Sequence, residues 1–522
     1  MTVARTALKE YLDKPLDSFT WLKRLTRDQL LDEFRSWRVH PKFKTDPWTH
    51  QLVCFYIGMC YPQFLMLLDM GLGKSKIILD ILTQRIRERK TRRAIITVPR
   101  LINLGSWEDA VAEHSNLGCT IVSAENKDAK FEALLKPKGE ITIVDYSGLQ
   151  YALSKKGKGT KNGNSIDKMI PDEKRIQMVA KEYDFFGMDE SHKSKNRDTL
   201  RWKVLHKLTQ EMPARFATTG TLFGRDPTDL FAQFQLIDGG ETFGDTLGMF
   251  RAAFFQEVSN GFGVDYKFDR SMTRTLYKRL QHRSIRYDED ECVDLPERRE
   301  ILVKSPFTDE QREHYLRAVD GLISANGQLR ETDSAYLRMR QIVAGFIQWR
   351  DEYGKHEVTF PLNHKLDQLE RLIEEAGSSK VVVSHEYTRS GELITQRLDA
   401  LGIKYEWLHG GSKDPVNAVR RFNSDPACRV FVMNSDSGGT GVDGLQKSVR
   451  YLIFYESPVS PITRKQAIKR IHRPGQRHAC VVYDLIVVGS VDVRILRMIE
   501  EGKNLHEAIV DGSFDIRQLR LV

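Results

Sequence analysis

The sequence predicts an α/β fold built from two parallel-sheet domains with a helical insertion or bridge between them. Short apolar runs alternate with helical patterns over residues 46–237, and the alternation resumes over residues 363–500. Strands that are apolar along their whole length are typical of parallel sheets covered by helices on both faces. Over residues 238–362 the strand pattern is lost and basic helical segments dominate, which indicates the insertion or bridge.

The expected strands coincide with the apolar runs. In the first domain they lie at residues 64–68, 94–98, 120–123, 141–144, 185–188 and 215–218. In the second domain they lie at residues 381–384, 405–408, 430–433, 451–455 and 481–486. Residues 1–45 are expected to form a small N-terminal helical element and residues 501–522 a C-terminal tail. The Gly/Lys-rich segment 155–164 is expected to be a loop, which either contacts phosphates or, the slightly favoured alternative, is a solvated insertion.

Length and composition limit the class of protein. A chain of 522 residues exceeds one ordinary core, and 40% hydrophobic residues suffice for globular packing. The formal net charge of +9 favours a polyanionic partner without proving one. The six cysteines form no C-x-x-C pair and no Cys/His cluster, which argues against zinc and disulfides and fits a reducing compartment.

The sequence gives no sign of a membrane segment. Its apolar runs are all shorter than the roughly 18 residues that a membrane helix needs, and the N-terminus lacks the apolar core of a signal peptide. We therefore expect a protein of the bacterial or host cytoplasm, or of the nucleus if the source is eukaryotic.

A Gly-rich segment follows the first apolar run and precedes a helical pattern. From residue 71 to residue 75 it reads Gly-Leu-Gly-Lys-Ser. Glycines let backbone N–H groups turn toward a phosphate, and the helix adds its positive N-terminal end. Lys74 would supply a cation for the β- and γ-phosphates, and the Ser75 hydroxyl suits Mg²⁺. Leu68 replaces the first glycine of the usual pattern, and the alternative is a turn with a surface lysine, but the strand–loop–helix context favours a nucleoside triphosphate site.

A pair of carboxylates follows a later apolar run. Asp189 and Glu190 come directly after residues 183–188, which are predicted to end a strand. A carboxylate at a strand tip can hold Mg²⁺, and a second one beside it can take a proton from attacking water. We assign Asp189 to the metal and Glu190 to the base. A solvated acidic turn is the alternative, and the phosphate loop upstream disfavours it.

With these two motifs in place, the chain resembles the superfamily-2 helicases, and within them the Swi/Snf-type duplex-DNA translocases. The resemblance extends from about Trp48 to Leu505 and implies two RecA-like domains. Gln51 matches the adenine-reading glutamine of the family. The segment from Asp69 to Ser75 matches its Asp/Glu-Met-Gly-Leu-Gly-Lys-Thr/Ser loop, which implies that the nucleotide is also contacted by Met70, Gly71, Leu72 and Gly73.

Three further motifs in the first half of the chain resemble family motifs that contact nucleic acid or couple it to the nucleotide site. Residues 189–196 resemble the Asp-Glu-x-His-x-x-Lys-Asn motif of the family, in which His192 would couple the two sites. The Thr-Gly-Thr string that links nucleotide and DNA in the family is matched by Thr219, Gly220 and Thr221. Leu222 and Gly224 replace the proline and glutamine that usually follow. Val98 and Pro99, followed by Trp107, resemble the segment that meets the tracking strand.

The second half carries two more matches. Residues 438–443 resemble the Gly-Gly-x-Gly-x-Asn loop, which implies nucleotide contact by Gly441, although Asp443 replaces the asparagine. Residues 466–476 match the string Gln-Ala-x-x-Arg-x-x-Arg-x-Gly-Gln, the most specific signal in the chain. Arg470 and Arg473 are three apart on a predicted helix and so share one face. Their planar, permanently charged forks suit phosphate oxygens, and across a cleft between the domains they would act as arginine fingers; the alternative is a solvated basic helix.

The resemblance implies an ATP-driven motor that uses ATP and Mg²⁺ and moves on nucleic acid, most plainly double-stranded DNA, with no membrane partner. The first alternative is a strand-separating, branch-migration or annealing DNA helicase, or an RNA helicase, since motor cores look alike. The second is a nucleic-acid-binding scaffold with a relic ATP site. No histone-tail reader, zinc module or nuclease signature is recognisable, and so compact a core points to a bacterial or phage source.

Overall fold

The structure is a computed structural model of the whole chain. It describes residues 18–161, 164–220, 227–259, 264–292, 295–324, 329–351, 354–409, 412, 415–435 and 444–501. The chain divides into two compact units, Met1–Val293 and Asp294–Val522. Each unit contains one large parallel sheet with helices on both faces, as the sequence predicts.

The first unit is built on a seven-stranded sheet in which every strand pair is parallel, in the order β11-β1-β8-β7-β2-β4-β3. The strands are β1 Gln63–Leu68, β2 Ala94–Val98, β3 Cys119–Val122, β4 Ile141–Asp145, β7 Phe185–Asp189, β8 Ala214–Thr219 and β11 Ser284–Tyr287. Six of them confirm the predicted apolar runs to within one or two residues. The seventh, β11, lies in the segment 238–362, where basic helical segments and no strands were expected.

Helices cover both faces of this sheet because successive strand residues point to opposite sides. Phe64, Met66 and Leu68 face one core, and Leu65 and Leu67 face the other. The first core is closed by η1 Thr20–Arg24, α2 Arg27–Arg35, α3 Thr49–Cys60, α4 Lys74–Arg87 and α5 Ile102–His114. The second is closed by α6 Lys127–Leu135, α7 Tyr146–Ala152, α8 Glu173–Ala180, α9 Leu200–Thr209, α10 Thr228–Ile237, α11 Leu247–Phe254 and α12 Thr273–Leu280. Short turns η2 Ser191–Ser194, η3 Arg270–Met272 and η4 Glu289–Glu291 complete the unit.

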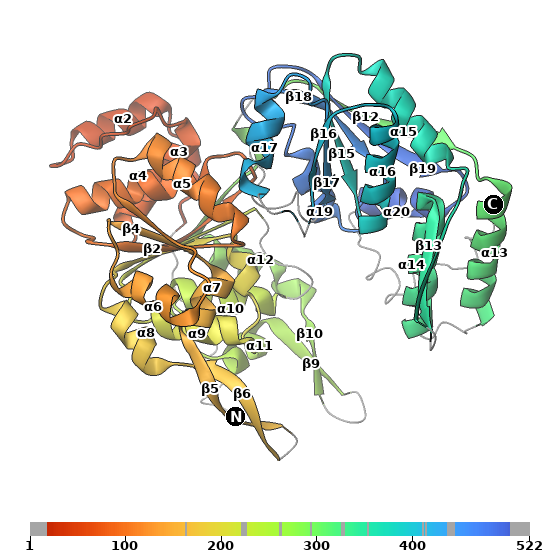
Figure 1. The fold of residues 1–522 in the computed structure, drawn as a ribbon. Helices are drawn as coiled ribbons and strands as arrows, with labels where there is room; N and C mark the ends of the chain where they lie inside the picture. Colours follow the sequence, from red (N-terminus) through yellow and green to blue (C-terminus); the bar gives the residue numbers. More distant parts are fainter. Residues whose placement is uncertain are drawn as a thin grey trace. The chain divides into compact units, whose positions relative to one another are not determined.

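Two hairpins extend from the first unit (Figure 1). The strands β5 Ser154–Lys161 and β6 Asn164–Pro171 pair antiparallel, and so do β9 Phe255–Ser259 and β10 Val264–Phe268. The prediction of a loop at residues 155–164 is therefore wrong. A Gly/Lys-rich composition favours solvated backbone, but a ribbon whose strands bond to each other can satisfy its backbone and leave its side chains in water.

The second unit has a six-stranded parallel sheet in the order β12-β19-β18-β15-β17-β16. Its strands are β12 Arg298–Ser305, β15 Lys380–His385, β16 Tyr405–Leu408, β17 Val430–Asn434, β18 Val449–Phe454 and β19 Cys480–Val487. A separate hairpin is formed by β13 Phe346–Asp351 and β14 Gly354–Thr359. The helical elements are α13 Asp309–Ser324, α14 Leu329–Ala344, α15 His364–Glu375, α16 Thr388–Ala400, α17 Pro415–Ser424, η5 Leu445–Lys447, α19 Pro461–Ile468 and α20 Val491–Glu500.

The segment 238–362 departs most from prediction. It contains helices, but it also supplies β11 to the first sheet and β12 to the second, besides two hairpins. Both sheet strands lie at edges and are only partly covered, and Ile301 and Leu302 of β12 are 41% and 50% exposed. These two edge strands therefore lack the continuous apolar run that identified the other strands.

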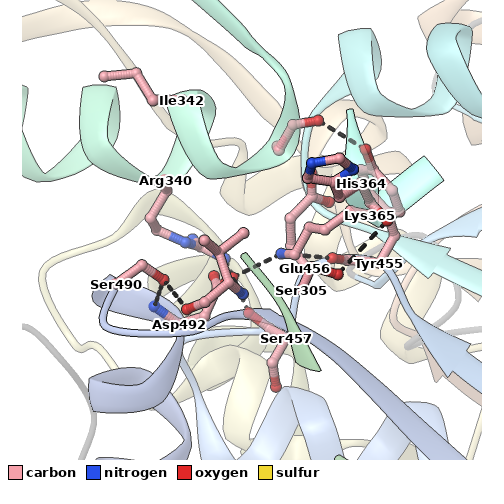
Figure 2. Close-up of polar contacts among 12 residues, drawn as sticks. Ser305, Arg340, Ile342, His364, Lys365, Tyr455, Glu456, Ser457, Ser490 and Asp492 are labelled. Carbon is pink, nitrogen blue, oxygen red and sulfur yellow. Dashed lines mark hydrogen bonds and ion pairs between the residues drawn. The ribbon is translucent and has the colours of Figure 1, made fainter. Parts of the chain in front are cut away.

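A buried polar network ties helices to strands inside the second unit (Figure 2). Lys365 of α15 bonds to Asp492 of α20 at 2.7 Å and donates to the Tyr455 carbonyl at 3.1 Å. Arg340 of α14 donates to the Ser457 carbonyl at 2.8 Å. Glu456, which is 1% exposed, accepts from the Ser390 hydroxyl and from the Glu386 backbone N–H. The network fixes α14, α15 and α20 around the end of β18.

Candidate nucleotide site

The phosphate loop joins β1 to α4 at the carboxyl edge of the first sheet. Gly71 and Gly73 have φ angles of +88° and +78°, the left-handed region that favours glycine. A Cβ at Gly73 would also collide with the amide of Gln51. The loop backbone therefore takes a shape that other residues cannot hold, and α4 begins at Lys74 with Ser75 as its second residue.

Helix α3 supports this loop from beside it. His50 donates from Nε2 to the Leu72 carbonyl at 2.9 Å, and Gln51 donates from Nε2 to the same oxygen at 3.2 Å. Burial lowers the pKa of the His50 ring, and the hydrogen bond to the Leu72 carbonyl partly opposes this shift. The Oε1 of Gln51 accepts from the Trp48 N–H at 3.0 Å. Gln51 thus lies against the phosphate loop with its amide already engaged.

The start of the loop is held by β11, which sequence analysis missed. The Asp69 backbone N–H donates to the Tyr287 carbonyl at 3.3 Å, and its Oδ2 accepts from the Glu289 N–H at 3.4 Å. Residues 220 positions apart are thereby joined at the edge of the sheet. The sequence signal that could have indicated β11 is the alternation of Ile285, Arg286 and Tyr287, in which the two apolar residues are buried and the arginine is exposed.

Lys74 and Glu190 form an ion pair with 2.8 Å between Nζ and Oε1. The other carboxylate oxygen of Glu190 lies 3.2 Å from Nδ1 of His192 and accepts from the Thr219 hydroxyl at 3.3 Å. The His192 ring and the Thr219 hydroxyl are themselves 3.0 Å apart. The structure therefore brings together residues predicted from three separate motifs.

Glu190 is strained and electrostatically tuned. Its φ of +50° is left-handed, one of two such non-glycine values in the described residues. Strain of this kind costs of order 1–3 kcal/mol and is concentrated at functional sites. Burial raises the pKa of the Glu190 carboxyl, but the Lys74 ammonium and the His192 ring outweigh burial, and the pKa lies well below its usual range.

Asp189 is held by three donors at the end of β7. Its Oδ2 accepts from the Trp107 indole N–H at 3.0 Å, and its Oδ1 accepts from the Thr218 hydroxyl at 3.1 Å. Its backbone carbonyl accepts from the Tyr146 hydroxyl at 2.9 Å. Burial, followed by the Glu190 charge, raises the pKa of the Asp189 carboxyl. A cation beside Asp189 would relieve both effects.

Trp107 was predicted to face a nucleic-acid track together with Pro99. The structure instead buries Trp107, 2% exposed, as a donor to Asp189. Pro99 is also buried. An apolar ring with one N–H suits this role, because it excludes water and still satisfies a carboxylate.

The remaining coupling residues lie beside the phosphate loop. A Cβ on Gly220 would stand 3.3 Å from the Leu68 carbonyl and 3.5 Å from Nζ of Lys74, so this turn passes close to the loop. Ser191 bonds to Gln233 of α10 at 3.0 Å, and Lys195 pairs with Asp229 at 2.8 Å. These contacts anchor the segment after Glu190 on helix α10. Thr221, Leu222 and Gly224 lie outside the described residues.

In the second unit, Arg470 and Arg473 were predicted to lie on a helix, and the structure shows that they do not. Helix α19 ends at Ile468, and Arg470 and Arg473 follow it in turns, closed by bonds such as that from the Arg470 N–H to the Ala467 carbonyl at 3.1 Å. The Gln476 amide stabilises these turns through the carbonyls of Val449 and Ile471. Arg470 is buried at 3% exposure, while Arg473 is half-buried. Gly441 and Asp443 lie outside the described residues.

The donor set of the first unit fits a nucleoside triphosphate with a divalent cation. The backbone cradle contains two left-handed glycines and opens at a helix N-terminus. The groups available are one ammonium, one hydroxyl and two carboxylates, from Lys74, Ser75, Asp189 and Glu190. They follow the carboxyl ends of β1 and β7, the two strands that flank β8 in the sheet. Within the described residues, no helix is both long enough and apolar enough to cross a membrane.

Comparisons with known proteins agree with these motifs. A model of the SNF2-related domain matches residues 48–352, and a model of the helicase conserved C-terminal domain matches residues 364–475. A RAD54-like DNA repair and recombination protein of Drosophila mojavensis is 24% identical over 364 residues, which are 62% of this chain and 46% of that protein. The DNA repair and recombination protein RDH54 of Saccharomyces cerevisiae (strain YJM789) is 31% identical over 152 residues, 29% of this chain and 16% of that protein.

One solved structure is also similar over most of its length. It is the Sulfolobus solfataricus SWI2/SNF2 ATPase core in complex with dsDNA, with 19% identity and a TM-score of 0.40, covering 93% of this chain and 97% of that chain. The chain spans less than half the length of the two curated relatives above. Because the first family model covers more than half of the sequence, the chain belongs to the SNF2-related family.

Proposed function

We propose that this protein is an ATP-dependent motor that moves on duplex DNA. The observation that carries the proposal is the cluster of Lys74, Glu190, His192 and Thr219, which joins the phosphate loop to the segment expected to communicate with a track. Family membership implies ATP use. The names of the curated relatives refer to DNA repair and recombination, and the net charge of +9 suits a polyanion.

The first unit would bind the nucleotide. The loop from Met70 to Gly73 would cradle the phosphates, Lys74 would contact the β- and γ-phosphates, and Gln51 would meet the adenine. Ser75 and Asp189 would hold Mg²⁺, which neutralises phosphate charge when bound. Trp107 and Thr218 keep the Asp189 oxygens oriented toward that place.

Glu190 would act as the base. In the structure its partner is the Lys74 ammonium, which must turn to the phosphates when nucleotide binds. Glu190 then loses the charge that lowers its pKa, while its burial remains and raises the pKa. A carboxylate with a higher pKa accepts a proton from water more readily. The ion pair therefore restrains the base until nucleotide is present.

The second unit would supply Arg470 and Arg473 as arginine fingers for the bound triphosphate, the role that the resemblance implies. Their charge is permanent, and such fingers are worth on the order of a thousandfold in rate. Hydrolysis would be coupled to the track by His192, Thr219, Gly220 and Thr221. Pro99 would belong to the same coupling region of the first unit. The track contacts would be to phosphates and would not read bases.

The proposal is tested by measuring ATP hydrolysis with duplex DNA, single strands and RNA as activators. Turnover should be weak alone and highest with duplex DNA. Lys74→Ala should weaken MgATP binding and abolish turnover, whereas Glu190→Gln should keep ATP bound and lower turnover by at least about a hundredfold. Lys203→Ala, an exposed lysine on α9, is the control and should behave as wild type. Full turnover without DNA would refute the motor, and equal activation by RNA would refute the duplex track.

A strand-separating, branch-migration or annealing helicase remains the nearest alternative, and a displaced-strand assay on forked and branched DNA separates it from a translocase. A scaffold with a relic ATP site is disfavoured, because a relic has no need of the strained Glu190 paired with Lys74.

A further inference from the structure

The β5–β6 ribbon concentrates positive charge. Residues 154–171 contain five lysines against one aspartate, a net charge of +4 in a chain whose whole excess is +9. No acidic cluster inside the ribbon balances it. Nothing in the nucleotide site uses these residues, so their charge needs a separate explanation.

The pairing register places lysines on both faces of the ribbon. Residues paired across the strands share a face, as do residues two apart along a strand. Lys155 is opposite Ile170, and Lys156 is opposite Met169. Lys155 and Lys156 therefore point to opposite faces, with Lys168 on the first and Lys158 on the second. All four side chains are exposed.

The ribbon is fixed at its base. The Asp172 N–H donates to the Leu153 carbonyl at 2.8 Å, and the Lys127 ammonium donates to the Ser154 carbonyl. Arg175, which follows the ribbon, pairs with Asp128 of α6 at 2.6 Å. From this base the ribbon extends beyond helices α7, α8 and α9 (Figure 1). The lysines of the ribbon thus lie on an element that is anchored at its base.

Lysines on a two-stranded ribbon have a simpler explanation, since charged side chains prevent edge strands from pairing with other chains. Here the four described lysines occupy both faces, while the one carboxylate of the ribbon, Asp167, is exposed and lies opposite Lys158 in the register. Lys155 also has a carboxylate nearby, that of Asp172, at 3.8 Å.

A two-stranded ribbon has the dimensions to enter the major groove of duplex DNA, about 12 Å wide, where phosphates line both sides. Lysines on both faces would then meet phosphates of both strands. We propose that the β5–β6 ribbon is a second binding site for the phosphates of duplex DNA, outside the motor site. This inference rests on the proposed function, because it takes duplex DNA as the partner of the chain.

The test compares three variants of the full chain in binding to a 40-base-pair duplex without nucleotide, over a range of salt concentrations. The first replaces Lys155, Lys156, Lys158 and Lys168 by alanine. The second replaces the same four by arginine. The third is a matched control that removes the same charge from exposed lysines elsewhere in the unit, namely Lys42, Lys90, Lys136 and Lys138.

Each phosphate contact contributes about 0.9 to the salt slope on duplex DNA. The alanine variant should lose roughly 2 to 4 from the slope and bind at least about tenfold more weakly near 0.1 M salt. The arginine variant should retain the wild-type slope, and the control should lose less than about 1. An unchanged slope in the alanine variant, or an equal loss in the control, would overturn the ribbon site.

A second measurement separates this inference from the proposed function. The duplex concentration that half-stimulates ATP hydrolysis should rise about tenfold in the alanine variant, in line with its affinity. If wild type is not stimulated by duplex at all, the proposed function fails. If wild type is stimulated and the alanine variant requires no more DNA, the ribbon site alone fails. Melting curves of the variants exclude unfolding as the cause.

Discussion

At the scale of single residues, Trp107 shows how the site is preorganised. Its indole N–H bonds to one oxygen of Asp189, while the Thr218 hydroxyl bonds to the other. Both donors are buried, so the carboxylate is oriented before any cation arrives. Preorganised positioning is the main contribution a protein makes to phosphoryl transfer.

Trp107→Phe should therefore weaken the use of Mg²⁺. A lost hydrogen bond to a charged group is worth about 1.5–3 kcal/mol, so the Mg²⁺ concentration for half-maximal hydrolysis should rise roughly tenfold or more. Trp202→Phe is the matched control, because Trp202 is buried in the same unit and donates to the Ala232 carbonyl. Equal Mg²⁺ requirements in the two variants would limit Trp107 to a packing role.

At the scale of elements, the end of helix α19 sets the position of the arginines. If the helix continued, Arg470 and Arg473 would share one face. Because it ends at Ile468, the backbone turns, and the Gln476 amide closes the turns through two carbonyls. The order of residues in the string is thus compatible with a backbone shape other than a helix.

Arg470→Ala and Arg473→Ala should each lose DNA-stimulated hydrolysis, by about a thousandfold, and still bind nucleotide. Arg470→Lys should show the same loss, since it keeps the charge without the planar fork. The exposed Arg477 provides the control. Intact hydrolysis with weaker DNA binding, and a salt slope smaller by about one, would make these arginines phosphate contacts instead.

At the scale of the whole molecule, buried charge in the second unit links its stability to pH. Burial raises the pKa of the Glu456 carboxyl to about 7, against the opposing charges of Lys365 and Arg340. The ordinary value is near 4.5, so between these two values the folded chain keeps a proton that the unfolded chain has lost. Stability therefore falls as pH rises through this window and is level above it.

Chemical denaturation at several pH values should show this loss. Wild type should lose up to about 3 kcal/mol of unfolding free energy between pH 4.5 and pH 7, from the linkage of one raised carboxyl pKa. Glu456→Gln cannot titrate and should show a correspondingly flatter dependence. Asp80, whose pKa burial raises to about 6, contributes equally to both proteins. Identical profiles for the two would exclude Glu456 as the source.

The sequence by itself determined the central strands and the order of the chemical groups. Apolar runs such as residues 94–98 mark strands buried on both faces, because burial on both faces leaves no polar position. The loop from Asp69 to Ser75 and the pair Asp189–Glu190 could be proposed as a nucleotide site, because phosphate and metal chemistry would constrain residue type at fixed spacing. The local sequence pattern was therefore sufficient to predict an element or a candidate site wherever burial or site chemistry constrains neighbouring residues.

Only the tertiary structure decided the edge strands β11 and β12, the contacts that support the phosphate loop, and the buried charged networks. β11 and β12 lie at sheet edges, so they have no continuous apolar run. The roles of Trp107 toward Asp189 and of Lys365 toward Asp492 depend on contacts between residues 82 and 127 positions apart in the sequence. The left-handed backbone conformation of Glu190 likewise cannot be predicted from the local sequence. Such features arise from long-range packing, which fixes distances that no local periodicity encodes.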